Sequence, residues 1–146
     1  MTVTRLAYFD TSVLVKRYVK ERGSTATRKL LERYRFLSSA VAPVEALSAL
    51  SRRRTDGELT QRDFLAIKSR LHKDRAYWEL VEVGPIVLSQ AEELVQRAGL
   101  RTLDALHVAS ALTFQAASGL TIPFVTADVR QRDAAESLAL NLIWIE

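Results

Sequence analysis

The sequence predicts an α/β fold built around a mainly parallel β-sheet. Short apolar runs alternate along the chain with longer stretches of helical periodicity, and strands separated by helices favour parallel pairing. The first run, residues 6–9, shows no alternation of apolar and polar residues, which is typical of a strand buried on both faces. Right-handed crossovers would place helices on both sides of such a sheet. We find no repeat, low-complexity tract or Pro/Gly-rich linker, so we expect residues 1–146 to form one domain.

The first quarter of the chain contains two predicted strands and two predicted helices. Residues 6–9 form the first strand, and residues 13–20 form the helix that follows it. Ser24 comes directly after a glycine and is a suitable N-cap for a second helix over residues 24–34. Residues 36–38 form the next short strand.

The next segment predicts a helical hairpin. The first helix covers residues 41–53, with Pro43 in the first turn, where its missing N–H costs little. A turn over residues 55–57 leads to a helix over residues 60–74. Thr60 is its expected cap, because Asp63 stands three residues later, as in a capping box.

The C-terminal half alternates strands and helices. Gly99 and Gly119 follow two of the helices and are expected to end them. The predicted strands cover residues 78–83, 123–126 and 142–145, and the predicted helices cover residues 85–98, 103–118 and 130–137.

Composition narrows the class of protein. The 146 residues are 48% hydrophobic and 26% charged, and no apolar run approaches the ~20 residues of a membrane span. The chain has no cysteine, which excludes disulfides and thiolate metal sites. We therefore expect a cytoplasmic protein that does not interact with a membrane. The net charge of +4 is compatible with a phosphate-bearing partner.

Two aspartates stand at the ends of predicted strands. Asp10 follows the first strand, and Asp128 follows the strand at residues 123–126. If both strands are central and parallel, both carboxylates arrive at the same edge of the sheet, where ligands bind in such folds. The alternative is that each carboxylate only caps the following helix.

Two further acids stand in helices of unusual composition. Asp104 begins a helix that is apolar nearly all round and should be buried; helix capping is the simpler explanation for it. Glu45 has small helical neighbours, which would allow another element to approach closely, although an exposed helix position is the default for glutamate. His107, one turn after Asp104, is expected to be a hydrogen-bonded core residue, and no histidine pair has the spacing of a zinc site.

Four segments resemble, in order, the motifs of the PIN-domain ribonucleases, and in particular the VapC toxins of type II toxin–antitoxin pairs. The first is Tyr8–Val15, with an apolar strand, an aspartate and Thr-Ser before a helix. Val44–Leu50 resembles the segment with the second acid, and Leu103–Ala111 closely resembles the third. The fourth is Phe124–Asp128, followed by Arg132–Ala135. The likeness covers nearly the whole chain, although the link at residues 138–141 lacks a glycine often found there.

The resemblance implies a three-layer α/β/α sandwich with a five-stranded, mainly parallel sheet and a protruding helical hairpin. It also implies an endoribonuclease with Mg²⁺ or Mn²⁺, a VapB-like antitoxin as partner, and a homodimer. Hard carboxylate oxygens suit these metals, and a divalent cation would relieve the repulsion among converging acids. The implied catalytic and metal-binding residues are Asp10, Glu45, Asp104 and Asp128. The hydroxyls of Ser12 and Thr126 are candidates to orient the acids or a water.

RNA is a polyanion, so basic residues around an acidic pocket must supply the attraction, and binding of this kind weakens with salt. The candidates lie on the first helix and at the tip of the hairpin. They are Lys16, Arg17, Lys20, Arg52, Arg53 and Arg54.

Other phosphate chemistries on similar sheets fit less well. A haloacid-dehalogenase-like phosphatase needs a second aspartate two residues after the first, where this chain has Ser12. A response-regulator receiver needs a late lysine, and no lysine follows Lys73. A PIN-like DNA or flap nuclease remains open, as does a non-catalytic PIN binding module. Such modules often lose acids, and here all four matched positions are acidic.

Overall fold

A five-stranded sheet organises the chain. The computed structural model describes residues 5–146, so the first four residues of the predicted domain lie outside the described residues. The strand order is β3-β2-β1-β4-β5, and every neighbouring pair is parallel, which confirms the predicted α/β class. The strands are β1 (Leu6–Phe9), β2 (Arg35–Ser39), β3 (Glu79–Val81), β4 (Pro123–Thr126) and β5 (Asn141–Trp144).

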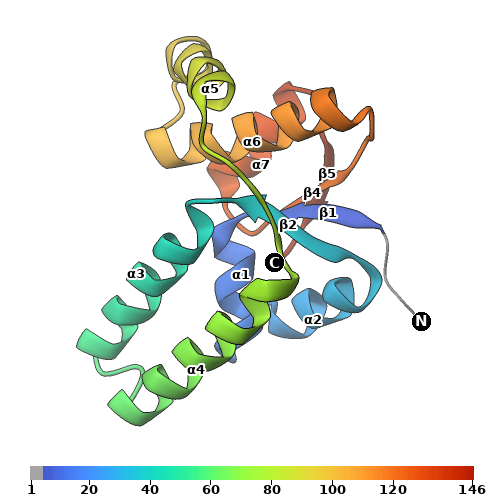
Figure 1. Cartoon of the computed structure of the whole chain (residues 1–146). Coiled ribbons are helices and arrows are strands. Elements are labelled where there is room, and N and C mark those ends of the chain that lie inside the picture. Colours follow the sequence, from blue (N-terminus) through green and yellow to red (C-terminus); the bar gives the residue numbers. More distant parts are fainter. Residues whose placement is uncertain (1–4) are drawn as a thin grey trace.

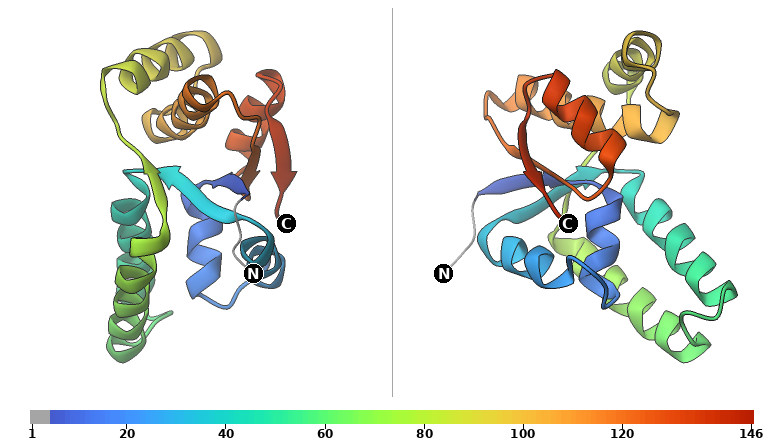
Figure 2. Two further views of the ribbon diagram at one scale, coloured as in Figure 1. Left: turned by 45° about the vertical axis from the view of Figure 1, so that its right-hand side comes forward. Right: turned by 180° about the vertical axis from the view of Figure 1, so that it is seen from behind.

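Helices cover both faces of the sheet, as Figures 1 and 2 show. Helices α1–α4 lie on one face and α5–α7 on the other. The side chains of β1 alternate between the two faces of the sheet. Ala7 and Phe9 pack towards α1–α4, whereas Tyr8 packs towards α5–α7. The helices are α1 (Thr11–Tyr18), α2 (Ser24–Arg33), α3 (Ala42–Thr55), α4 (Gln61–Asp74), α5 (Pro85–Ala98), α6 (Thr102–Ser118) and α7 (Val129–Ser137).

The predicted hairpin is α3 and α4, which run side by side and extend away from the sheet (Figures 1 and 2). Leu50 of α3 and Phe64 and Leu71 of α4 form its buried stripe. Thr60 caps α4 as predicted, accepting the N–H of Asp63 at 3.0 Å. A short 3₁₀ turn, η1 (Arg75–Tyr77), follows and was not expected from the sequence.

The predicted start of α1 and the predicted cap of α2 are wrong for local reasons. α1 starts at Thr11, two residues early, because the side chain of Asp10 caps it directly. Ser24 is the first residue of α2 and does not cap it; Gly23 takes that position with φ +88°. The Ser24 hydroxyl instead donates to Val19 O at 2.8 Å and accepts the N–H of Glu21 at 2.9 Å, so it closes the turn between α1 and α2.

The buried helix α6 lies on the same face of the sheet as α5 and α7 and packs against β2 and β3. Seven consecutive residues of α6, from Ala105 to Ala111, are buried, which confirms the expectation from its composition. Within residues 5–146, no helix combines the length and the apolar character that crossing a bilayer requires.

The link into β5 has strained backbone. Ala139 adopts φ +55° and is the only described non-glycine residue with positive φ. It lies in the segment that lacks the family's glycine. This conformation costs a residue with a Cβ about 1–2 kcal/mol of conformational free energy.

Replacing Ala139 with glycine should therefore stabilise the protein. We expect Ala139→Gly to raise the free energy of unfolding by about 0.5–1 kcal/mol, because relief of the strain exceeds glycine's extra unfolded-state entropy. Urea denaturation measures the change. The control is Ala117→Gly on the exposed side of α6, which should lose about 1 kcal/mol. A loss of stability in both variants would contradict the strain at Ala139.

Candidate active site

Asp10 is a buried carboxylate held on both oxygens. It follows β1, is only 2% exposed, and caps α1 by accepting the N–H of Val13 at 3.3 Å. Ser12 donates its hydroxyl to Oδ1, and Thr126 donates its hydroxyl to Oδ2, each at 2.5 Å. The capping role expected as an alternative is therefore present, together with contacts that capping does not require.

The two hydroxyls also bind the loop after β4. Ser12 Oγ accepts the N–H of Ala127 at 3.2 Å, and Thr126 Oγ1 accepts the N–H of Asp128 at 3.0 Å. Each hydroxyl therefore joins Asp10 to the backbone that leads into α7. Both hydroxyls contact Asp10, and the orienting role of Ser12 and Thr126 stays a prediction.

Burial raises the pKa of the Asp10 carboxyl. The hydrogen bonds from Ser12 and Thr126, and attraction to the His107 ring when it is protonated, act in the opposite direction, and burial outweighs them. Within residues 5–146, no cationic side chain forms an ion pair with Asp10. In the described part of the chain, the charge of this carboxylate thus has no ion-pair partner.

Asp104 and Asp128 are neighbours. Asp128 is partly buried and caps α7, accepting the N–H of Arg130 at 2.8 Å. Asp104 lies in the first turn of α6, but the residue at the cap position is Arg101, so the capping explanation for Asp104 is wrong. Burial raises the pKa of the Asp104 carboxyl, and repulsion from Asp128 adds to the rise.

Glu45 points inward from the first turn of α3. Its Oε1 accepts hydrogen bonds from Thr11 Oγ1 at 2.9 Å and from His107 Nε2 at 2.6 Å. The side chain is 18% exposed, so the exposed-helix alternative is wrong. His107 is buried, as expected, but its link to Glu45 was not predicted; the three-residue spacing from Asp104 was the only signal that His107 faces the acids.

The four acids do not form a closed metal cage. Among residues 5–146, no three histidine, aspartate or glutamate side chains lie close enough together to hold a metal ion unaided. Mg²⁺ typically binds through one or two carboxylates and keeps several waters, and Mn²⁺ also favours oxygen donors. The acids present, with Asp104 and Asp128 repelling each other, fit a hydrated ion of this kind, bound in part through water.

The basic residues predicted to bind RNA mostly have partners within the protein. Glu21 forms ion pairs with both Lys16, at 3.3 Å, and Arg53, at 2.7 Å. An RNA phosphate would have to compete with the Glu21 carboxylate for these two side chains. Arg54 lies over the ring of Phe64 at 4.1 Å. Of the rest, Arg52 donates to Ser48, Arg17 lies over the Tyr18 ring, and Lys20 is exposed.

Two arginines that the sequence analysis missed lie beside the acids. Arg130 Nε is 3.9 Å from Asp128 Oδ1, and the charges of Arg130 and Arg101 lower the pKa of Asp104, although burial prevails. Both arginines line a cavity of about 380 Å³ together with Asp104 and Asp133. The only sequence signal was that each stands two or three residues from a predicted acid.

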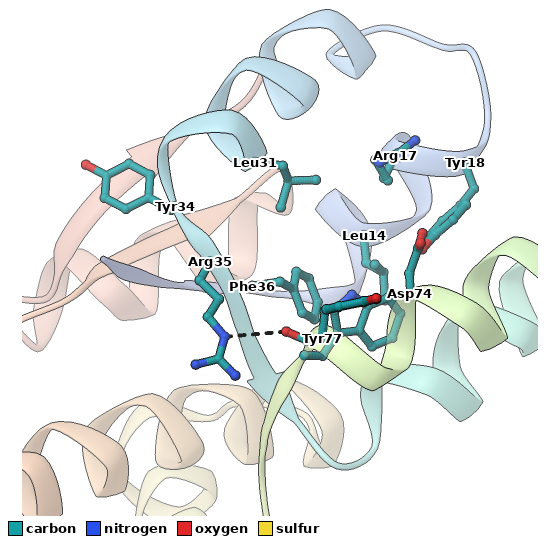
Figure 3. A pocket seen from close by; sticks show the side chains of 10 residues that line it. Leu14, Arg17, Tyr18, Leu31, Tyr34, Arg35, Phe36, Asp74 and Tyr77 are labelled. Carbon is teal, nitrogen blue, oxygen red and sulfur yellow. Dashed lines mark hydrogen bonds between the residues drawn. The ribbon is translucent and has the colours of Figure 1, made fainter. Parts of the chain in front are cut away.

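A second cavity, of about 240 Å³, contains none of the four acids. It lies between α1, α2, β2 and the end of α4, and Figure 3 shows its lining. Tyr18 donates to Asp74 at 2.6 Å, and Arg35 Nε donates to the carbonyl oxygen of Tyr77 at 3.5 Å. The other lining residues are mostly apolar or aromatic: Leu14, Leu31, Tyr34, Phe36 and Trp78, with Arg17 at the margin.

The fold agrees with comparisons to known proteins. The family model of the PIN domain matches residues 7–137, and the chain belongs to this family. Its curated relatives are VapC proteins. The chain is 34% identical to Ribonuclease VapC46 of Mycobacterium tuberculosis, over 93% of this chain and 95% of the relative. It is 31% identical to Ribonuclease VapC35 of the same organism, over 94% and 96%.

Solved structures of toxin–antitoxin proteins share the fold. One is a toxin–antitoxin complex from Klebsiella pneumoniae, with a TM-score of 0.67 and 14% identity over 94% of this chain and 95% of that chain. Another is VapBC2 from Rickettsia felis bound to a DNA fragment from its promoter, with a TM-score of 0.65 and 14% identity over 97% and 99%. The chain is thus a VapC-like PIN protein, as the motifs indicated.

Removing the Thr126 hydroxyl should destabilise the fold measurably. Thr126→Val keeps the shape of this fully buried residue but leaves Asp10 Oδ2 and the Asp128 N–H without a partner. We expect a loss of about 1–3 kcal/mol in the free energy of unfolding, measured by urea denaturation without metal. The same substitution at exposed Thr55 should change stability by less than about 0.5 kcal/mol. Equal stability of Thr126→Val and the wild type would contradict the described network.

Proposed function

We propose that this chain is a VapC-type toxin that acts as an endoribonuclease, hydrolysing phosphodiester bonds in RNA. The observation that carries the proposal is the link through the Thr126 hydroxyl from the Asp10 carboxylate to the backbone of Asp128, whose own carboxylate repels that of Asp104. Curated relatives named as ribonucleases, which match over nearly their whole length, support the activity.

Mg²⁺ or Mn²⁺ is the proposed cofactor. Asp10, Glu45, Asp104 and Asp128 would hold it, some directly and others through water. When bound, such an ion polarises a phosphate oxygen and lowers the pKa of a bound water, which makes hydrolysis possible at neutral pH.

The protein's own residues would prepare the site for the phosphate. Ser12 and Thr126 fix both oxygens of Asp10, so this acid needs little rearrangement when it acts. Arg101 and Arg130, which line the cavity beside Asp104, would attract the phosphates on either side of the bond to be cut. Lys16, Arg17, Lys20, Arg52, Arg53 and Arg54 remain proposed contacts for more distant parts of the RNA.

The proposed substrate is a structured RNA, such as a transfer or ribosomal RNA, in the cytoplasm. The proposed partner is a VapB-like antitoxin, and similarity to toxin–antitoxin complexes supports it. The aromatic cavity at the base of the hairpin (Figure 3) offers apolar surface for a segment of that partner, while a basic side chain of the partner would enter the acidic site. We also propose that the chain forms a homodimer.

Cleavage of RNA should require both the metal and the acids. We expect purified protein to cut structured RNAs at discrete positions in Mg²⁺ or Mn²⁺. Chelation should abolish cutting, and Asp10→Asn or Asp104→Asn should slow it about 100-fold or more, since a metal supplies several kcal/mol of charge stabilisation. Gel analysis of end-labelled RNA measures the rates. Asp56→Asn, at the exposed end of α3, is the matched control and should cut normally.

Two outcomes would replace this proposal. Preferential cutting of DNA or flap substrates would indicate the DNA-directed alternative. Binding of RNA without any cutting, by folded protein freed of antitoxin, would indicate a non-catalytic module. Normal turnover by folded Asp10→Asn protein would reject the assignment of Asp10.

Metal should also stabilise the folded chain, because it binds the folded state and relieves the repulsion between Asp104 and Asp128. At a metal concentration 100 times the Kd, we expect about 2.7 kcal/mol of stabilisation. Thermal unfolding with and without Mn²⁺ measures the effect. The Tm of Asp104→Asn should respond far less to Mn²⁺. An equal response in both proteins would show that the ion binds elsewhere.

A further inference from the structure

His107 is a buried histidine with both ring nitrogens hydrogen-bonded. It lies on α6 and is 2% exposed. Nδ1 is 2.7 Å from the hydroxyl of Tyr8, and Nε2 is 2.6 Å from Glu45 Oε1 and 3.2 Å from Thr11 Oγ1. Three elements, β1, α1 and α3, therefore meet at one imidazole.

The direction of each hydrogen bond follows from the donors available. A carboxylate only accepts, so Nε2 carries a proton and donates it to Glu45. In the neutral imidazole Nδ1 then accepts the hydroxyl of Tyr8, which is itself fully buried. Thr11 donates its hydroxyl to the same Glu45 oxygen. In this arrangement each of the four side chains forms a hydrogen bond that suits its donor or acceptor groups.

All described hydrogen bonds to the Glu45 side chain end on Oε1. Two donors from different elements fix this oxygen, so the carboxylate cannot rotate freely and Oε2 keeps one orientation. A free glutamate loses considerable rotamer entropy when it is ordered; here the surrounding residues impose that order before any ligand binds.

We propose that His107, supported by Tyr8, is a positioning residue for Glu45: it holds Oε1 so that Oε2 is available to the divalent ion or to its water. This inference rests on the proposed function. Tyr8 lies in β1, two residues before Asp10, which follows that strand, so the end of β1 positions Asp10 directly and Glu45 through the imidazole. The alternative is a buried polar network that stabilises the fold and does nothing for the metal.

Mn²⁺ binding to the full chain, measured by titration calorimetry or by electron paramagnetic resonance, separates these alternatives. Outer partners of metal ligands typically contribute 10–100-fold in affinity, so we expect His107→Leu to weaken Mn²⁺ binding by about that factor. His107→Gln should restore most of the affinity, because its amide N–H can reach the position of Nε2. A purely structural role predicts no such rescue of metal binding.

A double-mutant cycle tests whether His107 acts through Glu45. In a Glu45→Gln background, adding His107→Leu should cause little further loss of Mn²⁺ affinity or RNA cleavage, since coupled residues are not additive. Full additivity would overturn the proposal, as would wild-type Mn²⁺ affinity in folded His107→Leu protein. If His107→Leu does not fold, Tyr8→Phe decides: it should weaken Mn²⁺ binding in the same direction, and an unchanged affinity would overturn the proposal.

The wild type and Asp104→Asn separate failure of this inference from failure of the proposed function. If wild-type protein does not bind Mn²⁺, or binds it no better than Asp104→Asn does, then the metal site itself is wrong and the role of His107 falls with it. If the wild type binds Mn²⁺ and Asp104→Asn does not, the results for His107 concern positioning alone.

Discussion

The parallel pairing of β1 with β4 is the constraint on which the rest of the site depends. Tyr8 is opposite Phe124 and Phe9 is opposite Val125, and the Asp10 N–H extends the ladder to Val125 O at 3.1 Å. The rings of Tyr8 and Phe124 stack at 5.3 Å on the α6 side. Because parallel strands end at the same edge, this pairing brings Asp10 to Thr126, 116 positions later in the chain.

Near that edge, two sets of hydrogen bonds hold acidic side chains in place. Asp10 is held by hydroxyls that also bind the β4–α7 loop, so strand, helix and loop share one network. Glu45 of α3 accepts hydrogen bonds from the Thr11 hydroxyl of α1, on the same face of the sheet, and from the His107 imidazole of α6, on the other face. Asp104 and Asp128 instead remain mutually repulsive. An arrangement that concentrates negative charge in this way opposes folding stability, and such conflicts are characteristic of functional sites.

The basic side chains fall into two groups according to the residues that they contact. Several of those on α1 and at the tip of the hairpin contact other side chains of the protein: Glu21, between α1 and α2, links Lys16 of α1 to Arg53 of α3. Arg101 and Arg130 instead flank the acids and line the adjoining cavity. The net charge of +4 therefore does not identify an RNA-binding surface, because several of the basic side chains contact groups within the protein.

The sequence by itself determined the elements and the acids at their ends. The apolar run before Asp10, the threonine cap of α4, the buried character of α6 and the glycine stops follow from periodicity, capping and turn chemistry, which act over a few residues. Only the tertiary structure decided the partners of these side chains. Glu45 and His107 are 62 positions apart, and Ser12 bonds to a loop 115 positions away. Local patterns carry no information on such contacts, which depend on strand order and on how the helices pack across the sheet.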